Sequence, residues 1–230
     1  DFMSDQNKKG FKLVIILLLA YMAVHVLYTK IFLRFVDMPM QFSVMLQMIS
    51  YIVLGSVGVV LFWNELKEGI SLWKEHTGKT LCLFVVAYVL DILLSNLAYF
   101  PIMHLNPEYQ SLNEHSVAEL QGKFPALLLI IALGIMGPVT EEVIFRLAPI
   151  SLTEKKGKRI MIVLVTATLF MLIHVHAFTV EEFLYNIPQL VSGLIYGIVM
   201  VLSRNVTIPI FLHILNNLPA IVLATKYITN

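Results

Sequence analysis

The sequence predicts an all-α fold, a polytopic transmembrane helix bundle of about seven spans with a polar site inside it. Of the 230 residues, 58% are hydrophobic and only 13% are charged, whereas soluble domains carry roughly 25% charged residues. The hydrophobic residues form long runs, most of which reach the ~20 residues that a helix needs to cross a bilayer. The formal net charge of +1 gives no basis for nucleic-acid binding. Cys82 is the single cysteine, so an intramolecular disulfide is excluded.

Charged and turn-forming residues divide the chain into seven predicted spans. Their approximate bounds are 11–35, 41–63, 80–100, 124–150, 159–177, 183–203 and 207–228. The first run begins after lysines, as a signal peptide does, but it extends past a signal core and lacks a cleavage motif, so we expect a retained anchor. The sixth run contains Pro188, Gly193 and Gly197, which predict a kinked, short or partly re-entrant helix.

The distribution of lysine and arginine predicts that the N-terminus is cytoplasmic. Of the 16 Lys and Arg residues, eleven then lie on the cytoplasmic side, four lie on the far side and Arg146 lies within a span, as the positive-inside rule requires. The polar segment 101–123 is predicted to be an outer loop or a short surface helix. We expect spans one to three with this loop (1–123) and a site-bearing core (124–230) to form one integrated membrane domain.

Three charged residues lie inside the fourth predicted span, in the stretch GPVTEEVIFRLAPI. A charge at mid-bilayer costs at least a few kcal/mol and marks a functional site by default. Glu142 and Arg146 are four residues apart on one helix face, so they are predicted to pair. Glu141 lies about 100° away around the helix and is predicted to be the free carboxylate. Pro138 is predicted to kink this helix, and Thr140 to cap its second half.

Two further predicted spans place polar groups on one helix face. Phe170 and His174 are four residues apart in the fifth span, and His213 and Asn217 are four apart in the seventh. Helix-to-helix hydrogen bonds are the simpler interpretation of such groups. Together with Glu141, however, they are the parts of a hydrolytic site, because a carboxylate or imidazole can deprotonate water and other donors can stabilise an oxyanion. No serine or cysteine lies beside a base in the predicted core, which argues against a covalent nucleophile.

At these residues the sequence resembles the CPBP family of CAAX proteases and bacteriocin-processing enzymes, also called Abi or type II CAAX prenyl endopeptidases. The family pattern EExxxR occurs as EEVIFR at Glu141–Arg146, FxxxH as FMLIH at Phe170–His174, and HxxxN as HILNN at His213–Asn217. The resemblance covers roughly residues 124–220. It implies an intramembrane endopeptidase, embedded in the lipid bilayer, that cleaves a membrane-embedded peptide or protein.

The resemblance also implies a role for each matching residue. Glu141 would be the general base that activates water, and His174 would help to hold that water. His213 and Asn217 would form the oxyanion hole. Three further residues are expected to support the site: Glu142, Arg146 and Phe170.

A zinc ion is the alternative that these residues leave open. Glu141, His174 and His213 would make a two-histidine, one-carboxylate zinc set with water in the fourth position, and members of the family are often labelled metalloproteases. The sequence has no H-E-x-x-H motif. We favour glutamate-activated water without a metal, and therefore no cofactor.

Two other functions compete with peptide hydrolysis. The first is a partner-binding membrane protein of the same fold, acting in bacteriocin immunity or in the regulation of a sensor kinase. The second is a proton-coupled transporter, because buried Glu and His also serve as proton relays, although an inverted repeat is not evident. The use of Lys, Ile and Asn favours a bacterial cell membrane, where a leader peptide, pheromone precursor or bacteriocin is a more plausible substrate than a prenylated protein.

Overall fold

A computed structural model describes residues 20–21, 40–109 and 123–226 of the chain. The predicted first span therefore lies outside the described residues except for Ala20 and Tyr21, as does most of the predicted outer loop. The described residues contain helices and no strand. The helices outside the central span are α2 (Met40–Leu61), α3 (Trp63–Glu75), α4 (Thr77–Leu105), α9 (Lys156–His174), α10 (Val180–Tyr185), α11 (Ile187–Ser203) and α12 (Thr207–Lys226).

The fourth predicted span is a continuous helical segment, Ala126–Ile150, here called the central helix. It alternates between α-helical and π-helical stretches. These are α6 (Ala126–Leu129), η3 (Ile130–Met136), α7 (Gly137–Glu142), η4 (Val143–Leu147) and α8 (Ala148–Ile150). The residues at the junctions keep right-handed helical backbone angles, so the helix continues through Pro138, where a kink is predicted, with a π-helical stretch just before it. Such stretches are frequent at functional sites.

Five of the described helical segments are long and apolar enough to cross a membrane, which confirms an all-α integral membrane fold. In addition, α12 carries a shorter apolar stretch, Thr207–Val222. The prediction differs from the structure at two connections. Residues 63–75 form the amphipathic helix α3 rather than a loop, and α4 continues to Leu105, into the stretch predicted to be the outer loop. A search for apolar runs misses α3 because of its many polar residues, and it ends α4 early because Pro101 is read as a helix breaker.

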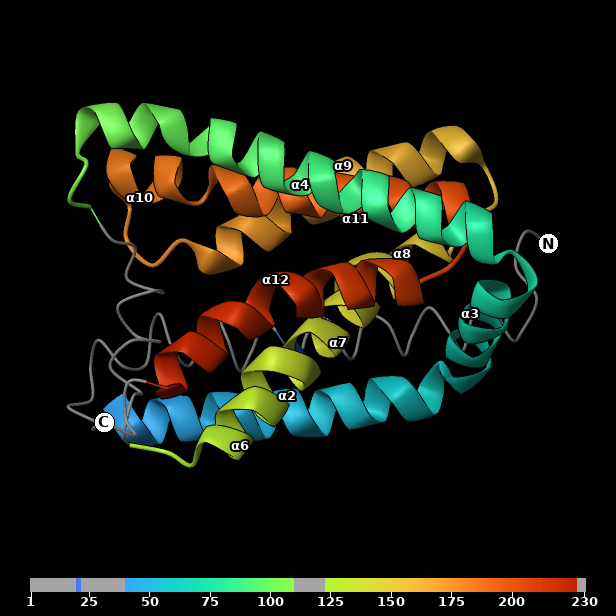
Figure 1. Ribbon diagram of the computed structural model, residues 1–230, viewed down its shortest axis with the longest axis horizontal. Helices are drawn as coiled ribbons and strands as arrows, with labels where there is room; N and C mark the ends of the chain where they lie inside the picture. The colour runs from blue at the N-terminus through green and yellow to red at the C-terminus, as the bar shows by residue number, and fades with distance from the viewer. Residues whose placement is uncertain (1–19, 22–39, 110–122, 227–230) are drawn as a thin grey trace.

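The helices are arranged around α12 and the central helix (Figure 1). Along one edge of the molecule lie α4, α9 and α11, with α11 packed between the other two. Along the opposite edge lies α2, which packs on the η3 and α7 parts of the central helix. Because α12 also packs on η3 and α7, residues of α2, α7 and α12 meet in the middle of the bundle.

Gly193 and Gly197 bring α11 close to α9. An added Cβ atom at Gly197 would lie 2.6 Å from Cγ1 of Val163, and one at Gly193 would lie 3.0 Å from Cβ of Ala167. Small residues four apart are a common means of close helix packing in membranes. The predicted sixth span is interrupted at Asn186, between α10 and α11 and next to Pro188, and these glycines serve packing within a regular helix.

A leucine at position 197 is expected to destabilise the protein by about 1–3 kcal/mol, the typical cost of overpacking. The leucine side chain would have to separate α11 from α9, since the Val163 side chain already fills the space. Thermal unfolding of purified protein in detergent measures the effect. Gly157→Leu is the matched control, because a Cβ atom at Gly157 would have no neighbour within 4 Å. Equal unfolding midpoints for the two variants would contradict this account of the packing.

Candidate active site

The central helix carries the two glutamates and the arginine into the interior of the bundle. Glu141 is 4% exposed, and Glu142 and Arg146 are both 0% exposed. Thr140 does not cap a second half-helix as predicted. Its hydroxyl instead donates to the carbonyl of Met136 at 2.7 Å and lies 3.1 Å from the carbonyl of Tyr51 on α2. This contact joins α2 to the turn of α7 that carries the glutamates.

Glu142 and Arg146 form the ion pair that their spacing predicts. Nη1 of Arg146 donates to Oε1 of Glu142 at 2.9 Å, and both side chains are fully buried. The guanidinium also lies over the ring of Phe170, with Cζ 4.3 Å from the ring centroid. A cation over an aromatic face is attracted by the ring quadrupole. Phe170 of α9 therefore helps to hold the arginine beside the carboxylates.

His213 of α12 bridges the two glutamates. Its Nδ1 lies 2.8 Å from Oε1 of Glu142, and its Nε2 lies 3.6 Å from Oε2 of Glu141. The expectation that Glu142 pairs only with Arg146, while Glu141 alone meets His213, is therefore wrong. Helical geometry separates the two glutamates by about 100°, but α12 packs against α7, and one imidazole is long enough to contact both.

Glu141 is not the free carboxylate that the helix-face argument predicts. Its Oε1 accepts hydrogen bonds from the hydroxyls of Tyr21 at 3.0 Å and Tyr51 at 2.8 Å. Both tyrosines are almost fully buried. They come from the first and second predicted spans, and sequence reasoning missed both. A tyrosine in a span more often marks the membrane interface, so its residue type alone does not predict a catalytic partner.

His174 is the last residue of α9, and Asn217 lies on α12 with His213. Nδ1 of His174 is 2.7 Å from the carbonyl oxygen of Phe170, and since a carbonyl only accepts, this nitrogen carries the hydrogen. Phe170 also contacts the rings of both His174 and His213, with centroid distances of 4.8 and 5.7 Å. Asn217 is half-buried, one turn beyond His213.

The alternative zinc set of Glu141, His174 and His213 stays a prediction. Within the part of the chain that the structure describes, no three His, Cys, Asp or Glu residues are grouped as metal ligands. One nitrogen of His213 faces Glu142, and one nitrogen of His174 donates to its own helix backbone. Metal-ligating histidines commonly make the same contacts through their second ring nitrogen.

Comparison with known families identifies the part of the chain that carries these groups. Residues 123–219 match the family model of type II CAAX prenyl endopeptidases, Rce1-like. This segment is an Rce1-like domain. The match confirms the resemblance stated from the three motifs, and at the level of the family it supports a CAAX-type intramembrane protease. No curated protein and no solved structure matches the chain.

The Rce1-like domain contains the glutamate pair, Arg146 and both histidines, but residues before it complete their surroundings. Tyr21 and Tyr51 precede the matched segment. Asp91 of α4 also precedes the matched segment. It is 1% exposed, and sequence reasoning missed it as well. A signal was present, because Asp91 is a lone acid in the third predicted span, and the criterion applied to Glu141 applies equally to it.

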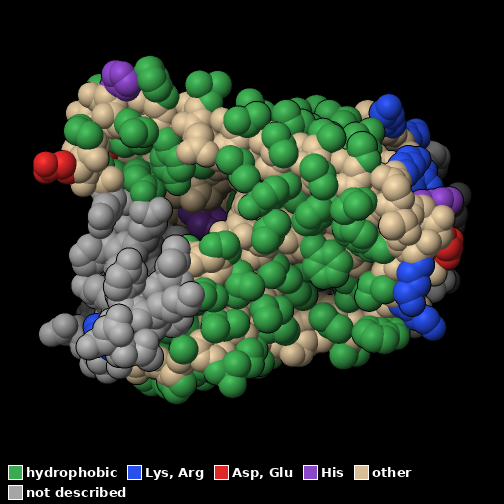
Figure 2. Space-filling model, viewed as in Figure 1, with side chains coloured by type: hydrophobic (Ala, Val, Ile, Leu, Met, Phe, Trp, Pro, Cys, Tyr) green, Lys and Arg blue, Asp and Glu red, His purple; other side chains and the backbone are tan. Residues whose placement is uncertain are grey.

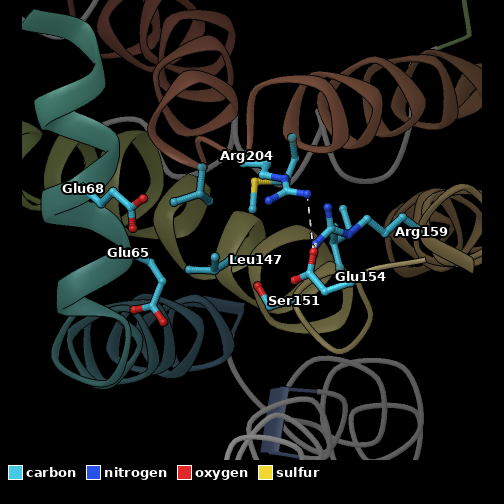
Figure 3. Close-up of a pocket in the computed structure, with 10 residues that line it drawn as sticks. Glu65, Glu68, Leu147, Ser151, Glu154, Arg159 and Arg204 are labelled. Atoms are coloured by element: carbon cyan, nitrogen blue, oxygen red, sulfur yellow. Dashed lines mark hydrogen bonds and ion pairs between the residues drawn. The ribbon is translucent and has the colours of Figure 1, made fainter. Parts of the chain in front are cut away.

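A pocket of about 140 Å³ lies at the other end of the central helix from α6 (Figure 3). The residues that line it include Leu147, Ile150, Glu65, Glu68 and Arg204. None of the predicted site residues lines it. Lysine and arginine side chains gather at this end of the molecule in the space-filling view (Figure 2). The same view shows a hollow beside α10, with a histidine side chain at its bottom.

Glu182 of the Rce1-like domain anchors the segment that follows His174. The carboxylate is 0% exposed; Oε1 accepts from the backbone N–H of His176 at 3.1 Å, and Oε2 accepts from the hydroxyl of Tyr109 at 2.5 Å. Thr179 caps α10 by accepting from the Glu182 backbone N–H. Burial and then the neighbouring Glu182 raise the pKa of Tyr109 from its ordinary value of 10.0 to about 12.

The raised pKa of Tyr109 predicts a loss of stability at alkaline pH. A group whose pKa is higher in the folded state stabilises the protein below its unfolded pKa and loses that contribution as pH rises through its folded pKa. The window here runs from pH 10.0 to about 12. Unfolding midpoints measured across it for wild type and Tyr109→Phe should converge as pH rises, because the variant lacks the hydroxyl. A midpoint difference that stays constant across the window would contradict the assignment.

Proposed function

We propose that the protein hydrolyses a peptide bond of a membrane-associated peptide or protein, with a water molecule activated by Glu141. The observation that carries this proposal is the buried cluster of Glu141, Glu142, Arg146 and His213 at the centre of the bundle. It joins two carboxylates to one guanidinium and one imidazole, with distances of 2.8 to 3.6 Å between partners. An arrangement of this kind supports proton transfer away from bulk solvent.

The charges of the cluster indicate where a mobile proton resides. Two carboxylates and one guanidinium leave a net charge of −1, and an unbalanced charge is costly to bury. One additional proton between Nε2 of His213 and Oε2 of Glu141 balances the cluster. Nδ1 of His213 faces the carboxylate of Glu142, which orients the imidazole so that Nε2 lies toward Glu141. Oε1 of Glu141 is held in place by the two tyrosine hydroxyls.

In the proposed reaction, Glu141 removes a proton from water as the water oxygen attacks the peptide carbonyl carbon. His174 orients that water through Nε2, which is an acceptor because Nδ1 carries the hydrogen. Nε2–H of His213 and the side-chain amide of Asn217 donate to the developing oxyanion. When the C–N bond breaks, Glu141 returns the proton to the leaving amine, so a carboxylic acid and an amine are released and the enzyme is regenerated.

We propose that no metal takes part, and this yields a direct prediction. Incubation with a chelator such as EDTA, followed by its removal, should leave the rate of hydrolysis unchanged, because the water is activated by a carboxylate rather than by a Lewis acid. The rate is measured before and after treatment. Loss of activity that added zinc restores would overturn the glutamate mechanism.

The proposed substrate is a leader peptide, pheromone precursor or bacteriocin in a bacterial cell membrane, and the N-terminus is proposed to be cytoplasmic. To find it, membrane peptides from cells that produce the wild type or Glu141→Ala are compared by mass spectrometry. Peptides that accumulate intact in the variant cells are then incubated with wild-type proteoliposomes. Cleavage there, absent with the variant, is the expected result.

Binding is scored on the same proteoliposomes, since a partner-binding protein is the competing function. An enzyme should lose processing but keep peptide binding when Glu141 is replaced by alanine. Glu142→Ala is compared in parallel, because Glu142 contacts His213 and Arg146 but is not the proposed base. If the biological effect survives both substitutions, the protein acts as a scaffold and the proposal is wrong.

A further inference from the structure

The buried carboxylate of Asp91 on α4 is the centre of a second polar cluster. The carboxylate is 1% exposed. Its Oδ1 accepts from the hydroxyls of Ser192 at 2.7 Å and Ser95 at 3.3 Å. Its Oδ2 accepts from the hydroxyl of Tyr196 at 2.7 Å and, through a short contact, from Nδ2 of Asn216.

These donors link three helices through one carboxylate. Ser95 lies on α4 with Asp91, Ser192 and Tyr196 lie on α11, and Asn216 lies on α12. Among the described residues, no lysine, arginine or histidine pairs with Asp91. The carboxylate therefore depends on neutral donors to offset the cost of its burial. Such a dependence keeps the donors, and the helices that carry them, in a defined arrangement.

The cluster sets the rotation of α12 about its own axis. Nδ2 of Asn216 donates to Asp91 on α4 and to the hydroxyl of Tyr196 on α11, the latter at 2.7 Å. Asn217 lies about 100° further around the helix, and His213 is one turn before it. A rotation of α12 that broke the Asn216 contact would also move His213 relative to Glu141 and Glu142.

Tyr196 connects this cluster to the candidate active site directly. It is 1% exposed, and its ring centroid lies 5.8 Å from that of His213 and 5.8 Å from Cζ of Arg146. Its hydroxyl is held by Asp91 and its ring packs against the imidazole. A displacement of the Asp91 carboxylate would therefore move Tyr196 and, with it, the His213 ring that contacts both glutamates.

We propose that Asp91 is a positioning residue of the active site, acting through Asn216 and Tyr196 to set the orientation of His213 and Asn217. The roles of His213 and Asn217 rest on the proposed function, but the geometry that Asp91 controls does not. A test therefore needs one readout of that geometry and one of activity.

The test exchanges the two partners. Asn216→Asp places two carboxylates in direct contact, whereas Asp91→Asn combined with Asn216→Asp restores one amide donor and one carboxylate. In the double variant, the amide introduced on α4 can turn its N–H₂ toward the carboxylate introduced on α12. The hydroxyls of Ser95 and Ser192 can still donate to the carbonyl oxygen of that amide, because an amide oxygen accepts as a carboxylate oxygen does. Asn96→Ala is the control, since Asn96 lies on the same helix as Asp91 but is exposed and donates to the backbone carbonyl of Ile92.

The geometry is followed by ¹⁵N NMR of the imidazole nitrogens, with His213 signals assigned by their loss in His213→Gln. Activity is followed as kcat and KM for a peptide identified in the processing experiment. Asn216→Asp should shift the His213 signals and lower kcat by about 10²-fold, the scale expected of a misplacement near 1 Å, with KM nearly unchanged. The double variant should restore both readouts toward wild type, and Asn96→Ala should change neither.

Tyr196→Phe keeps the test decisive if Asn216→Asp does not fold, because it removes only one hydroxyl and should also shift the His213 signals. Unshifted His213 signals in either folded variant, or a double variant that folds but restores nothing, would overturn the positioning role. Shifted signals in a protein that cleaves no peptide would support the positioning role and reject the proposed function, so the two failures are distinguishable.

Discussion

A Glu141→Gln variant is expected to keep its fold and to hydrolyse peptide at least about 10²-fold more slowly than the wild type, the lower end of the usual contribution of a general base. Glutamine preserves the shape of the side chain, and its Oε1 can still accept from Tyr21 and Tyr51. An amide, however, cannot take a proton from water at neutral pH. The rate is measured as kcat on a peptide that accumulates in cells producing Glu141→Ala.

Two comparisons make this result specific. Glu68→Gln changes an exposed glutamate on α3 and should leave kcat unchanged. The unfolding midpoint of Glu141→Gln should remain close to that of the wild type, which separates loss of chemistry from loss of structure. A folded Glu141→Gln protein with wild-type kcat would exclude Glu141 as the base.

An Arg146→Met variant is expected to lose about 3–5 kcal/mol of stability, the cost of breaking a buried ion pair from one side. Both side chains of the pair with Glu142 are 0% exposed, so removal of the guanidinium leaves a buried carboxylate whose remaining side-chain contact is His213. Denaturant unfolding in detergent micelles measures the loss.

The control for this prediction is Arg204→Met. Arg204 pairs with Glu154 at 3.4 Å, but the two side chains are 71% and 76% exposed, and such pairs contribute roughly 0–1 kcal/mol. Adding Glu142→Gln to Arg146→Met removes the orphaned charge and should recover part of the lost stability. Equal losses for Arg146→Met and Arg204→Met would show that the buried pair does not stabilise the fold.

Contacts within one helix were predictable from the sequence, because they depend only on spacing. Glu142 and Arg146 pair as residues four apart do, and Phe170 contacts His174 in the same way. The three motifs that contain these pairs lie within the Rce1-like match. The catalytic roles assigned to Glu141, His174, His213 and Asn217 stay predictions, as does the division of the chain at residue 124.

Contacts between helices were not predictable, because hydrophobicity does not say which faces meet. The hydroxyls that hold Glu141 are 120 and 90 residues distant in the chain, and His213 is 71 residues from Glu142. Asp91 carried a usable signal as a lone acid in a span, yet its partners on α11 and α12 could not be named without the packing of those helices.

By itself, the sequence determined that this is an all-α membrane protein with carboxylates and histidines inside its bundle, since bilayer-length apolar runs and the cost of buried charge are local properties. Only the tertiary structure decided which of those side chains contact one another. It gives Glu141 two tyrosines, makes His213 the bridge between both glutamates, and ties α12 to Asp91, because a side chain's partners depend on how the helices cross.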